Sequence, residues 1–339
     1  MPKVSVVIPV YGVEKYIERC ARSLFEQTLN DIEYIFVDDC SPDKSIEILE
    51  RIIEEYRPRF VGERKVVRIE RMFTNSGQAA VRKHGIQFST GDYVIHCDSD
   101  DWVHPEMYER LYNYAVTGDY DMVWCDYYRS DGKHNEYIPQ ESDTQAVNLV
   151  GNMLAGSRSR LIGSVCNRLY KRRLQTSIIY PKANMNEDLV IVIQLTLACK
   201  KIGHLSQALY YYYVNPTSIC MEPNEKSVVR NLEGAIDNNR IIMQVLSEKG
   251  LDKCLSKQIV SKKLACKEIL IPLLGQRKYR NLWCDTFSEI NSQIMSNPYI
   301  SRNSKFRAFC MLYWCYPLYS FIKNMSVFIH KHYCPVKVD

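Results

Sequence analysis

The 339-residue sequence predicts an α/β fold, Rossmann-like, with a mostly parallel central sheet flanked by helices and a helical C-terminal extension. Two observations indicate this class. Runs rich in β-branched residues alternate with amphipathic stretches over the first hundred residues, a pattern typical of βαβ units. Polar and mostly acidic residues directly follow these runs, and ligands of open α/β sheets bind beyond the carboxyl ends of the strands.

Four strands are expected in the N-terminal part, each a short apolar run, at residues 3–11, 32–39, 65–72 and 91–98. Between these strands, apolar residues recur at spacings of three and four. This spacing predicts amphipathic connecting helices at residues 14–28, 41–56 and 76–89. Ser41 is the expected N-cap of the second helix, and Pro42 suits its first helical position.

The alternation changes after residue 102. A further strand is expected at residues 121–130, followed by a polar loop from Ser130 to Thr144. A tyrosine-rich strand is expected at residues 208–218, and helices at residues 145–155, 186–200, 226–250, 254–275 and 279–296. We therefore expect one domain over residues 1–215, with a change of pattern between residues 1–102 and 103–215, and a helical extension over residues 216–339.

Composition narrows the class of protein. Hydrophobic residues make up 46% of the chain and charged residues 24%, as in an ordinary globular protein, and a net charge of +5 gives no broad nucleic-acid footprint. The 13 cysteines include no Cys-x-x-Cys pair, and the N-terminus has no signal-peptide pattern. These features favour reduced thiols and a cytoplasmic chain.

The C-terminal tail carries the excess positive charge. Residues 301–339 hold six Lys and Arg residues against Asp339 alone. The apolar stretch from Ala308 to Ile322 is too short to span a bilayer and is interrupted by Pro317. Its aromatic and basic flanks suit a peripheral anchor at the inner face of the cytoplasmic membrane, and a core helix or a dimer interface is the alternative.

The strongest chemical signal is Asp98–Ser99–Asp100, directly after the fourth expected strand. Two carboxylates around one small residue can bind Mg²⁺ or Mn²⁺, which also bind phosphate oxygens. The alternative is an ordinary solvated turn or a helix cap. The position at a strand end favours the metal site.

Two further acidic pairs are candidates. Asp38 or Asp39 could accept hydrogen bonds from a uracil imide or a ribose hydroxyl, or could only order the turn before Ser41. Glu187 and Asp188 begin an apolar helix, where acidic residues suit the helix dipole, but one of them could also be a general base. The sequence has neither Gly-x-Gly-x-x-Gly after its first strand nor a Gly-Lys-Ser loop, which disfavours a dinucleotide site or a P-loop.

The order and spacing of these segments closely resemble family 2 glycosyltransferases of the GT-A fold, over residues 3 to about 215. The segments that carry the resemblance are "VSVVIPVYGVEKYIERCARSLFEQT", "IFVDDCSPDKS", "NSGQAAVRKHGI", "GDYVIHCDSDDW" and "NEDLV". In addition, "SVCNRLYKRRL" and "YYYYVNPTSI" are similar to the bacterial branch that builds capsule, O-antigen and exopolysaccharide.

The resemblance implies inverting transfer from a nucleotide-sugar, with uracil as the expected base, to a glycan or lipid-linked acceptor. It implies a nucleotide-binding half at residues 1–102 and an acceptor half at residues 103–215. It also implies the following roles: Pro9 and Tyr11 line the nucleotide pocket, Asp39 contacts the base, Gly77 and Arg82 lie near the ribose and diphosphate, Asp98 and Ser99 flank the ribose and phosphate, Asp100 binds Mn²⁺ or Mg²⁺, Asp188 is the catalytic base, and Glu187 supports it.

Two residues depart from the family pattern. Cys40 stands where glycine is common, so a positive φ there would be strained, and Lys83 stands where asparagine is usual. Neither change removes a group that the reaction needs. The alternatives are a non-catalytic sugar-nucleotide-binding or scaffold protein, and a nucleotidyltransferase, which should show a basic, glycine-rich phosphate loop that "PVYGVEKY" lacks.

Overall fold

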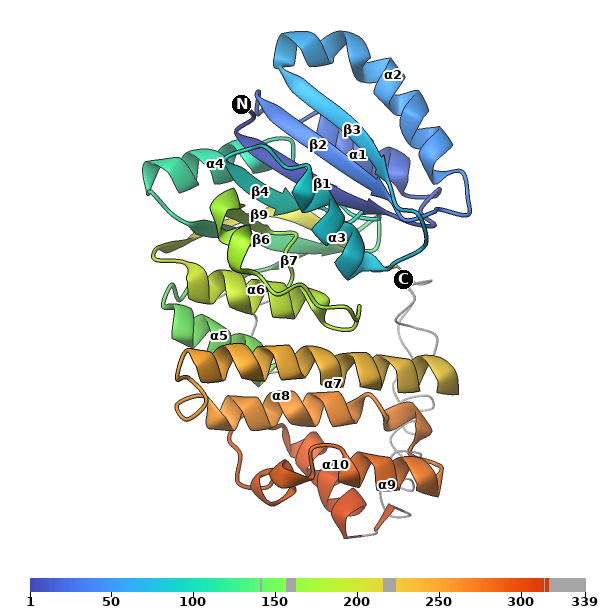
Figure 1. Ribbon diagram of the computed structural model, residues 1–339, viewed down its shortest axis with the longest axis vertical. Coiled ribbons are helices and arrows are strands. Elements are labelled where there is room, and N and C mark those ends of the chain that lie inside the picture. The colour runs from blue at the N-terminus through green and yellow to red at the C-terminus, as the bar shows by residue number, and fades with distance from the viewer. Residues whose placement is uncertain (141, 157–162, 216–223, 314, 317–339) are drawn as a thin grey trace. The chain divides into compact units, whose positions relative to one another are not determined.

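The computed structural model describes residues 1–140, 142–156, 163–215, 224–313 and 315–316 (Figure 1). Within these residues nine strands form one sheet in the order β3-β2-β1-β4-β8-β6-β9-β5, and β7 pairs with β6. The first four strands are parallel, as expected: β1 (Val4–Val10), β2 (Ile32–Asp38), β3 (Lys65–Arg71) and β4 (Tyr93–His96). This sheet, flanked by helices, confirms the α/β fold class.

Three helices connect these strands: α1 (Ile17–Phe25), α2 (Ser45–Glu63) and α3 (Gln78–Gln87). The prediction that Ser41 is the N-cap of α2 is wrong, because the helix begins at Ser45, four residues after Ser41. Ser41 instead belongs to the turn after β2, where its N–H donates to Asp38 Oδ1 (2.8 Å) and its hydroxyl donates to the Val10 carbonyl. The helix also continues beyond the expected end, through Pro58 to Glu63.

The second half of the sheet differs most from the expectation. Its elements are β5 (Trp102–Val103), α4 (Met107–Thr117), β6 (Met122–Ser130), β7 (Asn135–Ile138), α5 (Ala146–Ala155), β8 (Arg168–Lys171), the 3₁₀ helix η1 (Arg172–Ser177), α6 (Glu187–Ala198) and β9 (Ile202–Tyr213).

The polar segment expected to be a loop contains β7, which forms a hairpin with β6. Its polarity reflects its exposure at the border of the sheet, and Asp131 Oδ1 orders the turn by accepting the N–H groups of Lys133 and His134. Strand β9 begins at Ile202, six residues before the expected start.

Strand β8 lies antiparallel between β4 and β6, and β6 runs parallel to β9. Because two successive antiparallel pairings restore the strand direction, β6 and β9 end at the same edge of the sheet as β1 to β4. Residues that follow all these strands therefore meet at one edge.

Contacts divide the chain into two compact units. The first contains residues 1–153, 159–222 and 233–251, and the second contains residues 154–158, 223–232 and 252–339. Helix α7 (Glu225–Glu248) contributes to both units, and the expected division at residue 215 stays a prediction. The second unit otherwise consists of α8 (Ser256–Glu268), η3 (Ile271–Leu273), α9 (Arg277–Asp285), η4 (Ser288–Gln293) and α10 (Arg302–Leu312).

A buried lysine lies in the core of the second unit. Lys267 is fully buried, with its Nζ 4.1 Å from the centre of the Trp283 ring and hydrogen-bonded to Asn291 Oδ1. Burial lowers the pKa of Lys267 to about 8. The cation–π contact and the amide oxygen compensate for lost hydration, so Lys267 is part of the packing.

The C-terminal tail is described only in part. Its first segment is helix α10, in which Ala308, Cys310 and Met311 are buried within the second unit. The remainder of the apolar stretch, from Pro317 onward, lies outside the described residues. Among the helices that are described, none combines the length and the apolar character needed to cross a membrane.

Candidate donor and catalytic site

The predicted nucleotide-binding residues gather at the carboxyl edge of the parallel strands. Pro9 is half-buried near the end of β1, and Tyr11, directly after that strand, is 43% exposed. Backbone hydrogen bonds tie the segments that follow the strands, because the Asp39 N–H donates to the Val10 carbonyl (3.0 Å) and the Met72 N–H donates to the Asp38 carbonyl (2.9 Å).

Asp39 orders the loop that precedes α3. It is 4% exposed, and its two carboxylate oxygens accept the N–H groups of Ser76 (2.7 Å) and Gly77 (2.9 Å). Each oxygen keeps a second lone pair, so these bonds leave Asp39 able to accept a hydrogen bond from a ligand. The next residue, Cys40, has a φ of +61°, so a residue with a side chain adopts the left-handed conformation that glycine adopts most readily.

Gly77 brings two loops together at the start of α3. Its φ is +83°, and a Cβ there would overlap the side chain of Asn184, whose Oδ1 accepts the N–H of Ala79 (3.4 Å). Asn184 belongs to the loop before α6. The missing side chain therefore lets the segment that carries Glu187 and Asp188 approach the donor side of the site.

Arg82 joins the two halves of the site. It is fully buried in α3, and its Nη2 lies 3.0 Å from Asp98 Oδ1 and 3.1 Å from Asp188 Oδ1, while its Nε lies 3.6 Å from Glu187 Oε1. Burial opposes its charge, but the negative charges of Asp188 and Asp98 hold the Arg82 pKa well above its ordinary value. Helix α3, the turn after β4 and the start of α6 are far apart in the sequence, and they meet at the Arg82 guanidinium.

Asp98 and Asp100 have different environments. Asp98 Oδ1 accepts hydrogen bonds from both Arg82 and Gln78 Nε2 (3.0 Å). For Asp100, the described residues provide one long side-chain hydrogen bond, from Asn215 Nδ2 to Oδ2 at 3.5 Å. Burial, and then the charge of Asp98, raise the pKa of Asp100 to about 6. Ser99, between the two, is 6% exposed.

This donor set fits a divalent cation held by one carboxylate. A buried carboxylate whose charge is poorly compensated is stabilised by a cation, and hard oxygen ligands favour Mg²⁺ or Mn²⁺. The described residues contain no group of three or more His, Cys, Asp or Glu side chains that could enclose a metal. A cation at Asp100 would therefore need further ligands from substrate phosphate and water.

Glu187 and Asp188 form the other half of the site, at the start of α6. Their side chains are 9% and 21% exposed, and Asp188 Oδ2 accepts the N–H of Val165 (3.4 Å). Burial, and then the charge of Asp188, raise the pKa of Glu187 to about 8. This shift favours one proton on the pair at neutral pH.

Comparison with known proteins decides the family. The model of the family described as Glycosyl transferase family 2 matches residues 5–177, just over half of the chain. The chain belongs to glycosyl transferase family 2. The matched region contains the whole donor side of the site and ends ten residues before Glu187.

Relatives and solved structures agree with this family. The uncharacterised glycosyltransferase EpsJ of Bacillus subtilis is 29% identical over 240 residues, which are 69% of this chain and 67% of EpsJ. A poly(ribitol-phosphate) β-glucosyltransferase of Bacillus spizizenii is 31% identical over 62% of this chain, but the match spans only 32% of that protein. The crystal structure of Staphylococcus aureus TarS 1–349 has the same fold, with a TM-score of 0.64 and 19% identity over 91% of this chain and 86% of that one.

These comparisons confirm the enzyme class and the GT-A-like fold that the sequence predicts. The family 2 glycosyltransferase assignment replaces the alternative of a nucleotidyltransferase. The roles of the individual site residues stay predictions.

The shared proton predicts a pH dependence. Glu187→Gln is expected to keep most of its glycosyltransferase activity at pH 7, because glutamine imitates the protonated carboxyl group. In the wild type, raising the pH through about 8 ionises Glu187 and places a second negative charge beside Asp188. Activity should then change above pH 8 in the wild type but not in Glu187→Gln, as measured by initial rates from pH 6 to 10. Glu187→Asp, which still titrates, is the control, and identical alkaline limbs in all three proteins would contradict the shared proton.

Sequence reasoning missed the groups that support the site. Asn238 of α7 is 1% exposed and donates to the carbonyls of Ala183 (2.9 Å) and Met185 (2.8 Å), which fixes the loop before Glu187. A signal was available, because Asn238 occupies a core-facing position between Ala235 and Ile242 of an amphipathic helix. Gln78 and Asn184 carried no comparable signal.

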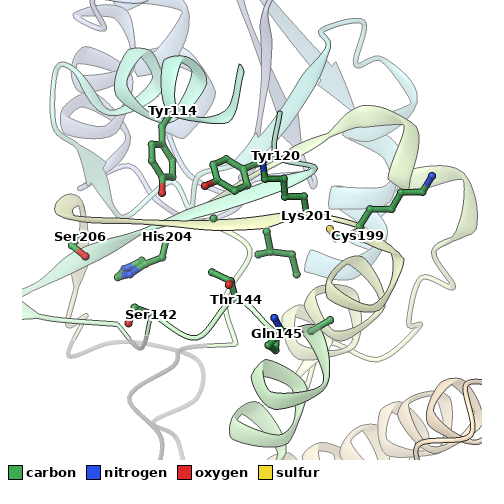
Figure 2. Close-up of a pocket in the computed structure, with 13 residues that line it drawn as sticks. Tyr114, Tyr120, Ser142, Thr144, Gln145, Cys199, Lys201, His204 and Ser206 are labelled. Carbon is green, nitrogen blue, oxygen red and sulfur yellow. The ribbon is translucent and has the colours of Figure 1, made fainter. Parts of the chain in front are cut away.

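The first half of β9 lines a separate cavity of about 530 Å³. Figure 2 shows Tyr114 and Tyr120 on one side of this strand, and His204, Ser142 and Thr144 on the other. None of the predicted site residues lines it, and it lies at the opposite end of β9 from Tyr213. The residues predicted for donor binding therefore lie elsewhere.

Proposed function

We propose that this glycosyltransferase moves a sugar, with inversion, from a UDP-sugar to a hydroxyl of a glycan or lipid-linked acceptor in capsule, O-antigen or exopolysaccharide synthesis. The observation that carries the proposal is the cluster around Arg82. It connects Asp98, next to the candidate cation ligand Asp100, with the buried acid pair Glu187–Asp188. The donor diphosphate would bind beside Asp98 and Asp100, and the general base would act from the Glu187–Asp188 pair, with Arg82 linking the two.

In this reaction the acceptor oxygen forms a bond to the anomeric carbon while the bond from that carbon to the diphosphate oxygen breaks. Asp188 takes the proton of the acceptor hydroxyl, and the nucleoside diphosphate leaves with the electron pair. Glu187, protonated at neutral pH, keeps a second negative charge away from the base. Arg82 holds Asp188 in place through the 3.1 Å contact.

On the donor side, Asp100 would hold Mn²⁺ or Mg²⁺, which neutralises the developing charge of the leaving diphosphate. Asp98 and Ser99 would contact the ribose and phosphate, and Gly77 would allow close approach to the loop before α3. Pro9, Tyr11 and Asp39 would line the nucleotide base. Crystal structures of TarS contain UDP or UDP-GlcNAc, and a mannosyltransferase of Pyrobaculum calidifontis with this fold contains GDP-Man and Mn²⁺, which supports a nucleotide-sugar donor and a cation.

The proposals for the acceptor and for the cellular location of the enzyme rest on the sequence. Two relatives are named as a poly(ribitol-phosphate) β-glucosyltransferase and a cholesterol galactosyltransferase, and these names support a polymeric or lipid acceptor here. We propose that the enzyme works at the inner face of the cytoplasmic membrane, with the basic, aromatic tail that begins near Arg302 as its contact. Retention of the full-length chain on anionic vesicles, but not of a chain that ends after residue 312 and so keeps helix α10, would test this.

The donor site is tested by calorimetric titration of UDP with and without Mn²⁺. Wild-type protein is expected to bind UDP in a Mn²⁺-dependent manner, and Asp100→Ala should lose this dependence because the cation loses its protein ligand. Asp237→Ala, which removes an exposed carboxylate paired with Arg240 on α7, is the matched control. Mn²⁺-dependent binding of equal strength in wild type and Asp100→Ala would reject the cation assignment.

A further inference from the structure

The guanidinium of Arg19, on α1, contacts two aromatic rings beside the candidate cation ligand. Its central carbon is 3.8 Å from the centre of the Trp102 ring and 4.7 Å from the centre of the Tyr213 ring. Its Nη2 donates a hydrogen bond to the backbone carbonyl of Asp100 (2.8 Å). The Arg19 side chain thus contacts the backbone of the turn, and the Asp100 carboxylate stays available.

The Trp102 ring is fixed by a row of aromatic side chains across four strands. Trp102 pairs with Tyr211 between β5 and β9, Tyr211 with Tyr128 between β9 and β6, and Tyr128 with Tyr137 between β6 and β7. The rings of Trp102 and Tyr211 are stacked 5.1 Å apart at 9°, and those of Tyr211 and Tyr128 are stacked 4.9 Å apart at 20°. This row gives Arg19 a rigid platform, because cross-strand aromatic pairs stabilise one another.

The backbone of the residue that carries the second ring, Tyr213, is held by Asp101, the neighbour of the candidate cation ligand. Asp101 is 2% exposed, and its carboxylate accepts the N–H of Tyr213 (2.7 Å) and the hydroxyl of Tyr210. The end of β9 is therefore anchored to the same turn that Arg19 contacts. Both rings and the turn form one rigid frame around the guanidinium.

The geometry of Arg19 suits a specific role in this frame. Its Nε is buried without a hydrogen-bond partner among the described residues, so the side chain gives up part of its hydrogen bonding where it contacts the two rings, which are tilted by 49° to each other. A planar guanidinium can contact an aromatic face and still donate a hydrogen bond in its own plane, which a lysine ammonium cannot do. The position of the Asp100 main chain sets the position of its carboxylate.

We propose that Arg19 is a positioning residue that holds the main chain of Asp100 and thereby sets the affinity for the cation and the donor diphosphate. This inference rests on the proposed function, because it takes Asp100 as the cation ligand. It assigns to α1 and to the β7–β6–β9–β5 aromatic row a part in donor binding that the motifs of the sequence do not indicate.

The experiment compares Arg19→Lys and Arg19→Met with wild type and Asp100→Ala. We expect Arg19→Lys to weaken Mn²⁺-dependent UDP binding in calorimetry by about tenfold, and Arg19→Met by at least as much, because a stacked, hydrogen-bonded cation is worth roughly one to two kilocalories per mole. The KM for the donor should rise by a similar factor, while kcat at saturating donor stays within about twofold of wild type, since only ground-state positioning is lost. Arg22→Lys, on the same helix and paired with exposed Glu18 and Glu55, is the matched control.

The outcomes separate the two proposals. If Asp100→Ala loses Mn²⁺-dependent binding but both Arg19 variants bind UDP like wild type, the role of Arg19 is overturned and the donor site stands. If Asp100→Ala binds like wild type, the cation assignment and the role of Arg19 fall together. If Arg19→Met does not fold, Arg19→Lys and Trp102→Leu carry the test, because removing the supporting ring should weaken Mn²⁺-dependent binding in the same direction.

Discussion

Asp188→Asn is expected to lower kcat for sugar transfer by a factor of about 10² to 10⁴, which is the usual effect of removing a general base. Asparagine has nearly the same shape and can still accept the Val165 N–H, but it cannot take a proton from the acceptor hydroxyl. Binding of UDP with Mn²⁺ should stay close to wild type, because the donor contacts lie on the other side of Arg82. Initial rates of UDP release and calorimetry on the same preparation measure both quantities.

The control for this substitution is Asp237→Asn, which changes an exposed carboxylate in the same way and should leave kcat unchanged. Full turnover by Asp188→Asn would reject Asp188 as the base. Loss of UDP binding together with turnover would instead show that Asp188 acts through the donor site. If the wild type binds UDP but transfers no sugar from any UDP-sugar to any acceptor, the alternative of a non-catalytic binding protein gains support.

Arg82→Met is expected to lower the free energy of unfolding by about 3–5 kcal/mol, the usual cost of breaking a buried ion pair by removing one partner. Methionine fills most of the space, but it leaves the carboxylates of Asp98 and Asp188 without the charge that compensates them. Urea denaturation at pH 7 measures the change. Transfer activity should fall as well, since Asp188 loses its support.

Two further variants make this prediction specific. Arg71→Met removes an exposed ion pair with Glu50 and should cost less than about 1 kcal/mol. Arg82→Met combined with Asp188→Asn should cost less than the sum of the single changes, because the second substitution removes one of the charges that the first leaves unpaired. Strict additivity would show that Arg82 and Asp188 do not interact in solution.

The first half of the fold could be predicted from the sequence because its signals are local. Strands β1, β2 and β4 are buried and read as apolar runs, and the turns after β1, β2 and β3 contain Gly12, Asp39 and Gly77. In the second half β6 and part of β9 could be predicted, but β7 and β8 could not, because these two strands carry polar residues. Strand β8 reads Arg-Leu-Tyr-Lys, and Arg168 is 1% exposed and donates to the Ser164 carbonyl and to Asn167 Oδ1. No periodicity indicates such a strand.

The same limit applies to the site. The sequence indicated Asp98, Asp100 and the pair Glu187–Asp188 as separate acidic motifs, and the structure brings Asp98, Glu187 and Asp188 to the same guanidinium. It could not indicate that Arg82 is enclosed between them. That arrangement depends on α3 packing tightly on β1 and β2 through Gly85, which is a contact between segments far apart in the chain.

The position of β8 in the sheet has a consequence for the order of folding. During synthesis β1 to β4 can pair as soon as residue 96 is available, but β4 has no partner on its other side until Lys171 reaches Tyr93. A nascent chain that ends earlier exposes an unpaired strand edge and holds Arg82 without Asp188, and both features favour aggregation or chaperone capture. Closing the gap between β4 and β8 is a long-range contact of the kind that slows folding. The nascent chain can therefore become active only late in synthesis, when α6 packs against a sheet that already contains β8.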